Sequence, residues 1–372
     1  MQSISRLVLT PHRWLLWIGL VLLVGYMTVC LFSFFYWVNP TLTGDSDQHI
    51  AADSSTYIYL AEVLEGKYTD PLAEAALATF PNTLWMPVLI AYLLKSTVAM
   101  GLFDVVLFCA SIMLFNKASD IDVLLLVFLL LLNPTTAISL ISVNKEIIDL
   151  FEVALFCYYL TTRHKWALAL TLLVALVNRY EVCAAFLLYL ILTGHLNPWR
   201  RRRWATLLWL ALGLSVLLPV AMGHSLATRY EAASAGGAIV ALDWLEMHYL
   251  FFLTIIPKTL ENLIVQAFYI SAKGAFSLQD VADSYILFFN NVATIIVLLV
   301  IGKKRTFTIS SDWYYLFLVS VVAMSITLII QPRYYYWSYV ILCLHAAQRQ
   351  RSFGRPRRAG VESINEPGTA HA

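Results

Sequence analysis

Charge is scarce in this chain. Lys, Arg, Asp and Glu together make up 13% of its 372 residues, against about 25% in an ordinary soluble domain. Hydrophobic residues make up 60%, the mean hydropathy is +0.72, and apolar runs recur along nearly the whole length. This composition excludes an ordinary soluble domain and predicts an all-α, polytopic membrane protein.

Cysteine is also scarce, and none of the five is placed for chemistry. Cys30, Cys109, Cys157, Cys183 and Cys343 all fall within apolar runs, without paired or metal-type spacing. Their positions indicate neither a disulfide framework nor a cysteine metal site, and predict inert, small apolar side chains.

Two further features are missing from the sequence. No small-residue cleavage site follows the first apolar run, Trp14–Val38, which is longer than the apolar region of a signal peptide. We therefore expect this run to be the first membrane helix. No internal repeat is strong enough to indicate the inverted pair typical of many transporters.

Ten apolar segments predict about ten membrane crossings. The segments are Trp14–Val38, Ser96–Phe115, Ile121–Leu132, Ile147–Leu160, Trp166–Val177, Val182–Leu192, Trp204–Met222, Tyr285–Ile301, Trp313–Ile330 and Tyr334–Ala347. Several are shorter than the roughly 20 residues that a lone spanning helix needs. We expect their polar flanking residues to lie at membrane depth and to face protein or a water-filled cavity.

The basic residues predict the orientation. With the N-terminus in the cytoplasm, nearly every basic cluster falls on the cytoplasmic side: Asn116–Asp120, Arg163–Lys165, Arg200–Arg203, Gly302–Arg305 and residues 349–372. The loop Asn39–Thr83 then lies outside and holds seven acids against the single Lys67. We expect both termini in the cytoplasm, one membrane domain over residues 1–348, and a disordered basic tail over residues 349–372.

Two long regions are predicted outside, residues 39–94 and 223–284. In the first, Tyr57–Glu65 is typical of a helix lying along the membrane surface. In the second, Pro257 and Lys258 separate two apolar pieces, Asp243–Ile256 and Thr259–Ile270. These pieces predict interfacial or re-entrant helices that line a cavity, or alternatively a hairpin that crosses twice.

An acidic, hydroxyl-rich segment, Asp45–Tyr57, follows the first apolar run. Asp45 and Asp47 form an Asp-x-Asp pair, which can hold Mg²⁺ or Mn²⁺ against a pyrophosphate. His49 is a candidate ligand, base or sugar contact, and alternatively an ordinary loop histidine. Asp53 has two interpretations, as the N-cap of the following helix or as a catalytic acid.

The pattern around Asp53 resembles the GT-C superfamily of polytopic glycosyltransferases, in its bacterial dolichyl-mannosyltransferase-like and aminoarabinose-transferase-like group. The matching elements are Asp53 with Tyr57 and Ala61, Phe80–Pro87, Asn133-Pro134, Lys145-Glu146, Arg179-Tyr180 and Arg333-Tyr334. Their order covers most of residues 14–347. The chain departs from the group because it lacks a second acid after Asp53, a later Asp-x-Asp and a large soluble C-terminal domain.

The resemblance implies transfer of a sugar from a polyprenyl-phosphate-linked donor to a glycan or lipid acceptor at the outer face. Asp53 would be the general base that takes the proton of the acceptor hydroxyl, with Asp45 or Asp47 as the next choice. Tyr57, His49 and Tyr334 are the candidate contacts to the acceptor or sugar. Tyr334–Trp337 has an alternative interpretation as an interfacial aromatic belt.

The leaving group in such a reaction is a lipid phosphate or pyrophosphate, whose charge calls for cations at the membrane surface. The candidates are Arg333, Arg179, Lys145, Lys258, Arg229 and Lys273. For Arg179 and Lys145 the alternative is a local ion pair with Glu181 or Glu146. For Arg333 the alternative is a side chain that extends to the interface.

The sequence therefore predicts a glycosyltransferase of the bacterial inner membrane that acts in cell-surface polysaccharide or glycolipid assembly. Its expected partners are the lipid-linked donor, membrane lipids and the acceptor, and no nucleic acid. The first alternative is a polymerase or ligase of lipid-linked polysaccharide repeats, in which arginines dominate the site. The second is a transporter of lipid-linked oligosaccharides, which needs charges within the membrane spans.

Overall fold

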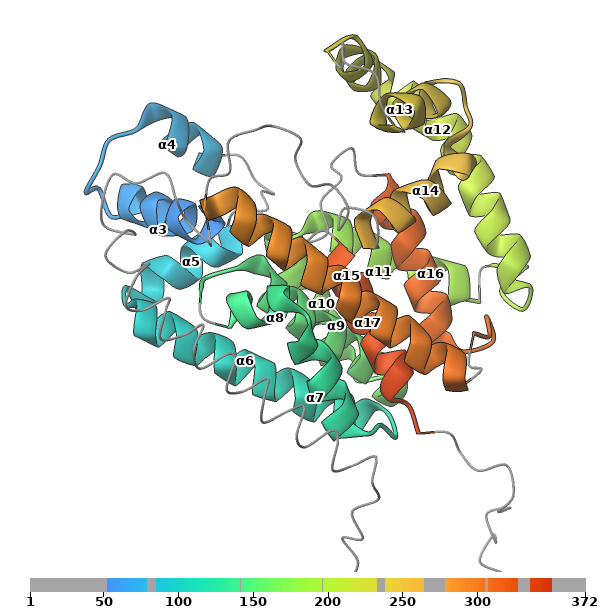
Figure 1. Ribbon diagram of the computed structural model, residues 1–372, viewed down its shortest axis with the longest axis horizontal. Coiled ribbons are helices and arrows are strands. Elements are labelled where there is room, and N and C mark those ends of the chain that lie inside the picture. Colours follow the sequence, from blue (N-terminus) through green and yellow to red (C-terminus); the bar gives the residue numbers. More distant parts are fainter. Residues whose placement is uncertain are drawn as a thin grey trace, which may run out of the picture.

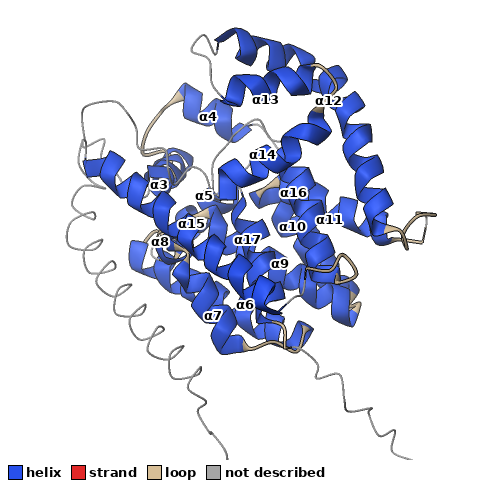
Figure 2. Ribbon diagram, turned by 45° about the vertical axis from the view of Figure 1, so that its right-hand side comes forward, coloured by secondary structure: helices blue, strands red, loops and turns tan. Residues whose placement is uncertain are grey.

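The structure is a computed structural model that describes residues 52–78, 85–140, 142–195, 197–232, 238–263, 278–304, 307–326 and 335–349. These residues form fifteen α-helices, α3 to α17, and no β-strand (Figures 1 and 2). The all-α prediction is thereby confirmed for the described part of the chain. Trp14–Val38, Asp45, Asp47 and His49 lie outside it.

The helices are α3 (Ala52–Leu64), α4 (Pro71–Ala78), α5 (Trp85–Leu94), α6 (Thr97–Ala118), α7 (Val123–Leu132), α8 (Pro134–Ser139), α9 (Lys145–Thr162), α10 (Lys165–Asn178), α11 (Tyr180–Thr193), α12 (Arg203–Ala232), α13 (Ala238–Met247), α14 (Phe251–Leu263), α15 (Leu278–Lys304), α16 (Asp312–Ser325) and α17 (Tyr336–Ala347). The nine predicted spans that reach the described residues all fall on helices. Helices α4 and α8 were not predicted.

Local sequence explains where several helices begin and end. The Asn133 side chain accepts a hydrogen bond from the Thr135 N–H at 2.8 Å, and Pro134 fills the first position of α8, where no N–H is needed. Arg163 has φ 60° and ends α9 in the left-handed conformation. Arg179 alone is extended between α10 and α11, so these two helices meet at a one-residue corner.

Helix α17 lies at the centre of the bundle. All its residues from Tyr336 to Ala347 are buried, and α7, α9, α15 and α16 pack around it. The core continues through α6, α10 and α11, where Phe156 stacks on Phe186 with ring centroids 4.2 Å apart. Three of the cysteines, Cys157, Cys183 and Cys343, are buried in this core without disulfides, as predicted, whereas Cys109 is exposed.

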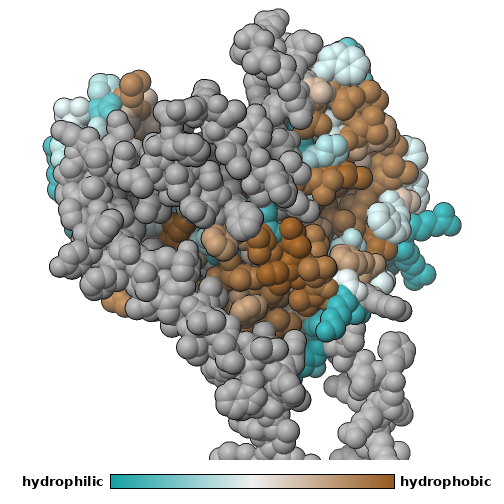
Figure 3. Space-filling view, in the orientation of Figure 1, coloured by the Kyte–Doolittle hydropathy of each residue, from teal (hydrophilic) through white to brown (hydrophobic). Residues whose placement is uncertain are grey.

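The outer surface of the bundle is apolar where a soluble protein is polar. Large hydrophobic side chains are exposed along α6, α10, α12 and α15; examples are Leu102, Val106, Leu173, Leu217 and Leu299. Figure 3 shows such side chains gathered over α15 and over the arm formed by α12 to α14. Polar and charged side chains are buried between the helices instead. This arrangement suits a lipid surrounding.

Two helical stretches, Val98–Ala118 and Arg203–Ala221, are long and apolar enough to cross a membrane. Most of the other apolar helices are 10 to 17 residues long. The structure therefore gives two clear span candidates among the described residues, where the sequence predicted about ten crossings. A helix of 14 residues rises about 21 Å, which is less than the roughly 30 Å of a hydrocarbon core.

The region around Pro257 differs from the prediction. Pro257 lies within α14 and does not divide it. The break comes earlier, at His248 to Leu250, where Tyr249 has φ 65° and the Leu250 N–H donates to the Leu245 carbonyl at 2.9 Å. This left-handed cap ends α13. Pro257 is the seventh residue of α14 and removes one backbone hydrogen bond, but the helix continues through it.

Candidate functional site

The segments predicted to be cytoplasmic meet at one end of the bundle. The Lys304 ammonium at the end of α15 donates to the Gln348 carbonyl, just beyond α17, at 2.9 Å. Arg203 at the start of α12 donates to the Ser310 carbonyl at 2.8 Å and pairs with Asp312 at the start of α16. We call this end of the bundle the basic end.

The start of α9 and the corner between α10 and α11 meet at the opposite end. Arg179 Nη2 lies 3.0 Å from Glu146 Oε1, and Arg179 Nε lies 3.3 Å from Asp149 Oδ2. The neighbouring Asn178 donates to Asp149 Oδ1 at 2.8 Å and to Glu152 Oε1 at 2.9 Å. All five side chains are buried. We call this group the corner cluster.

The corner cluster adds three residues that the sequence interpretation missed: Asp149, Glu152 and Asn178. A signal for the acids was present, because Glu146, Asp149 and Glu152 follow one another at three-residue spacing within an apolar run. Residues at that spacing are neighbours on a helix surface. The interpretation also expected the partner of Arg179 to be Glu181, whereas the structure pairs it with Glu146, 33 positions earlier.

Buried charge in the corner cluster is only partly balanced. Three carboxylates face one guanidinium, and Glu152 Oε2 and Asn178 Oδ1 have no hydrogen-bond partner among the described residues. Asp104 on α6 is a further acid buried inside a predicted span. Helices α6 and α9 therefore each carry buried acids within a predicted span.

Helix α3 brings two predicted site residues to the start of α9. The Lys145 ammonium lies over the Tyr57 ring, 5.6 Å from its centroid, and Tyr57 is buried beside Val143. Asp53 is the second residue of α3, one turn before Tyr57. It therefore lies within the first turn of α3 and not at its N-cap position, where a carboxylate still favours the helix dipole. Its side chain lies outside the described part, so its catalytic role stays a prediction.

Two other acids of the loop Asn39–Thr83, Glu65 and Asp70, already have partners within the protein. The pKa of Glu65 is lowered by hydrogen bonds from Lys95 and Lys67. The pKa of Asp70 is lowered by the Ala73 N–H and by the Tyr59 hydroxyl, as Asp70 accepts from the first turn of α4. Both are held in the carboxylate form by structural contacts, which leaves neither oriented for a substrate.

Lys258 belongs to a different cluster. Its ammonium lies 2.5 Å from Glu246 Oε1 and donates to the Ser325 carbonyl at 3.0 Å. The Thr254 hydroxyl also donates to Glu246 at 3.0 Å. Lys258 is thus neutralised between α13, α14 and α16. The Arg229 side chain, Lys273, Arg333 and Tyr334 lie outside the described part.

The aromatic run at the start of α17 is not an interfacial belt in its described part. Tyr335, Tyr336 and Trp337 are buried. The Tyr336 hydroxyl lies 2.9 Å from the Thr136 hydroxyl on α8, and Trp337 meets Phe186 edge to face. The belt prediction is wrong here because α17 is central, so its aromatic rings fill the core.

Metal ligands are not gathered in the described residues, which contain no group of three or more His, Cys, Asp or Glu placed to hold an ion. The predicted Mg²⁺ or Mn²⁺ pair, Asp45 and Asp47, lies outside them. Metal use by this chain therefore stays a prediction.

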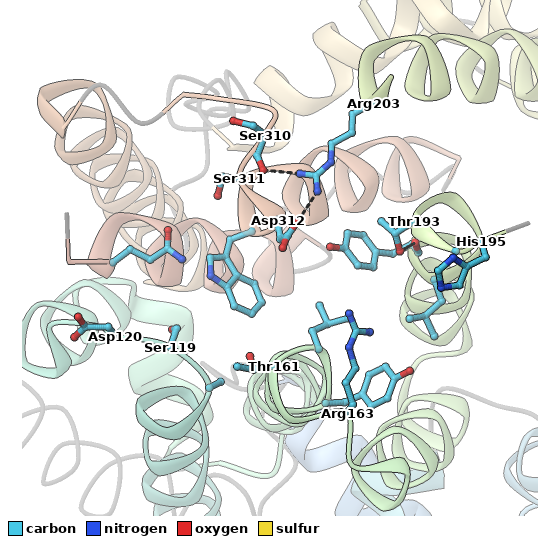
Figure 4. Close-up of a pocket in the computed structure, with 18 of the residues that line it drawn as sticks. Ser119, Asp120, Thr161, Arg163, Thr193, His195, Arg203, Ser310, Ser311 and Asp312 are labelled. Carbon is cyan, nitrogen blue, oxygen red and sulfur yellow. Dashed lines mark hydrogen bonds and ion pairs between the residues drawn. The ribbon is translucent and has the colours of Figure 1, made fainter. Parts of the chain in front are cut away.

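A cavity of about 1000 Å³ opens at the basic end (Figure 4). Its lining comes from the ends of α6, α9 and α11, the starts of α12 and α16, and the segment after α17. None of the site residues predicted from the sequence lines it. The protein thus carries two separate polar features, the corner cluster and this pocket, at opposite ends of the bundle.

Comparison with known proteins gives no relative: no family model, no curated protein and no solved structure matches the chain. The functional argument therefore depends on the geometry of the site alone.

Proposed function

We propose that the chain is a polytopic membrane glycosyltransferase that takes a sugar from a polyprenyl-phosphate-linked donor at the end of the bundle holding the corner cluster. One observation carries the proposal. Tyr57, Lys145 and Arg179 belong to three separate elements, and each lies at this end. All three are residues that the sequence pattern assigns to one site.

The chemistry assigns a role to each residue. Asp53, one turn before Tyr57, takes the proton of the acceptor hydroxyl as the anomeric carbon is attacked. Lys145 is half-buried and lies where the donor phosphate can approach from the α3 side. A positive charge there stabilises the departing lipid phosphate. Arg179 pairs with Glu146 and Asp149 behind Lys145 and so balances part of the negative charge of these acids.

A polymerase or ligase of lipid-linked repeats is the second candidate. It is favoured by the burial of Arg179, because an arginine anchored by two carboxylates is a rigid phosphate contact. In that reaction the arginine and Lys145 dominate, and Asp53 favours the start of α3 without taking part in the chemistry. The two candidates differ in which side chain is indispensable.

The test follows release of free polyprenyl phosphate or pyrophosphate from a lipid extract of the native host, incubated with purified protein. We expect release by the wild type and a loss of at least ~10²-fold in Asp53→Asn, the usual scale for removing a general base. Glu62→Gln is the matched control, because Glu62 is another acid of α3 that pairs only with Lys67 at the surface. It should retain full activity.

Other outcomes are equally informative. Full activity in Asp53→Asn with loss in Lys145→Gln would move the chemistry to the cations and favour the polymerase or ligase. No release by the wild type, with the lipids confirmed in the extract, would contradict glycosyl transfer. The buried acids of α9 would then point to a transporter.

A further inference from the structure

The cavity at the basic end has a lining that suits an anion. Arg163, Arg203 and Arg349 reach it from three separate segments, together with His195. Only two acids, Asp120 and Asp312, share the lining. A second hollow, lined by Arg200, Arg201 and Arg202, adjoins it and shares Thr193, Arg203 and Ser310 with it.

The two acids are already paired. Asp312 binds Arg203, which also donates to the carbonyls of Ile309 and Ser310. Asp120 lies 3.5 Å from Arg349. Arg203 is therefore a structural clamp between α12 and α16, and the acids of the lining are engaged by the arginines beside them.

Arg163 differs from the other two arginines. No carboxylate of the described residues lies within ion-pair distance of its guanidinium, which sits 5.8 Å from the centroid of the Tyr159 ring. Figure 4 shows Arg163 below and Arg203 above in the pocket, with Thr161 on the side of Arg163, Ser311 on the side of Arg203, and Ser119 farther off beside Asp120. Ser119 Oγ is buried and has no hydrogen-bond partner among the described residues.

The backbone at Arg163 adopts the left-handed conformation. It holds φ 60° at the end of α9, where glycine is the usual residue. A long cationic side chain is thus kept at a position where a glycine gives a more relaxed turn.

Tryptophans place the pocket at the depth of lipid headgroups. Trp166 and Trp204 are the second residues of α10 and α12, both are exposed, and both helices begin at the basic end. Exposed tryptophans are typical of the membrane interface. The pocket lies beside these helix starts, so a lipid phosphate can reach it without leaving its leaflet.

We propose that this pocket binds the phosphate group of an acidic phospholipid, with Arg163 as its principal contact. The shared chemistry is a phosphate ester, and a soluble phosphate compound is the other source. The site is independent of the proposed transferase site at the opposite end, and its occupancy does not depend on that activity.

The test titrates delipidated full-length protein in detergent with phosphatidylglycerol or phosphatidylcholine and counts bound lipids by native mass spectrometry. We expect tight binding of phosphatidylglycerol only, weakened at least ~10-fold in Arg163→Gly and Arg163→Gln, the scale of one charge-assisted hydrogen bond. Lys165→Gln is the matched control. Lys165 is exposed at the same end, two residues later, and does not line the pocket.

Arg163→Gly also separates binding from folding. Glycine suits the left-handed turn, so this variant should melt at the wild-type temperature or above while losing the lipid. Wild-type lipid binding in both Arg163 variants would overturn the proposal. A second arm titrates inorganic pyrophosphate. If pyrophosphate binds in an Arg163-dependent manner and phosphatidylglycerol does not, the lipid assignment is wrong and the ligand is soluble.

Discussion

Arg179 shows how one residue organises a whole end of the protein. It is both the last residue before α11 and the residue after α10, so its extended backbone turns the chain between them. Its side chain then reaches back to Glu146 and Asp149 on α9. Turning the chain and neutralising buried acids are thus combined at a single position.

Removing this arginine should be costly. Arg179→Gln leaves Glu146 and Asp149 buried without their cation, and breaking a buried ion pair typically costs about 3–5 kcal/mol. We expect a loss of that size in the free energy of unfolding in detergent. Lys67→Gln is the control, since its ion pairs are exposed at the surface and should contribute little to the free energy of unfolding.

A double variant distinguishes a structural from a functional role for Arg179. Arg179→Gln combined with Glu146→Gln removes both partners and should recover part of the lost stability, because fewer charges are left unpaired. If Arg179 also contacts the donor phosphate, sugar transfer stays lost in the double variant. Recovery of both stability and activity would limit the residue to a structural role.

At the scale of elements, α3 is held to the bundle by a buried face that contains Tyr57, Leu60 and Ala61. Tyr57 packs against Val143 and lies over Lys145, and Leu60 and Ala61 continue the same contact. The hydrophobic pattern of Tyr57–Glu65 predicted a helix here, and the structure has one over Ala52–Leu64. The pattern could not show that this helix packs on α5 and meets only the start of α9, through Tyr57 and Lys145.

Tyr57→Ala should therefore release α3 selectively. Truncating a buried aromatic side chain costs about 3–5 kcal/mol, which exceeds what one exposed helix can contribute by itself. We expect faster hydrogen–deuterium exchange across Ala52–Leu64 and unchanged exchange in α17. Tyr57→Phe keeps the ring and should keep the protection. Equal exchange in α3 and α17 of Tyr57→Ala would show that the helix does not move independently.

Most helix positions could be predicted from the sequence, because apolar runs and charged breaks mark them directly. The corner cluster could not, since each of its contacts joins positions more than 25 apart in the chain. The aromatic run of α17 was misassigned for a related reason. Tyr336 and Trp337 suit either a core or a membrane interface, and only the packing around α17 decides between them.

At the scale of the whole molecule, the protein has two chemically different ends. The basic end gathers Arg203, Lys304 and the pocket, and the opposite end gathers α3 and the corner cluster. The Lys and Arg counts along the sequence predicted which segments lie on the cytoplasmic side. The fold brings those segments together at the basic end. The counts could not predict the pocket, because its lining comes from six separate segments.

The two ends should face opposite sides of the membrane. In a cysteine-free background, Glu62→Cys at the α3 end should react with a membrane-impermeant thiol reagent in intact spheroplasts. Lys165→Cys at the basic end should react only after the membrane is permeabilised. Both positions are accessible on the described surface. The reverse labelling pattern would contradict the proposed orientation, and labelling of both before permeabilisation would contradict a spanning arrangement.

The three-residue spacing of the α9 acids has a mechanical consequence. Each step of three residues turns about 300° around a helix, so Glu146, Asp149 and Glu152 wind around α9 instead of forming a straight line. Arg179 engages the first two acids and Asn178 the last two. Rotation of α9 about its axis would break contacts on both sides at once. The corner cluster therefore fixes the angular setting of α9 relative to the corner between α10 and α11.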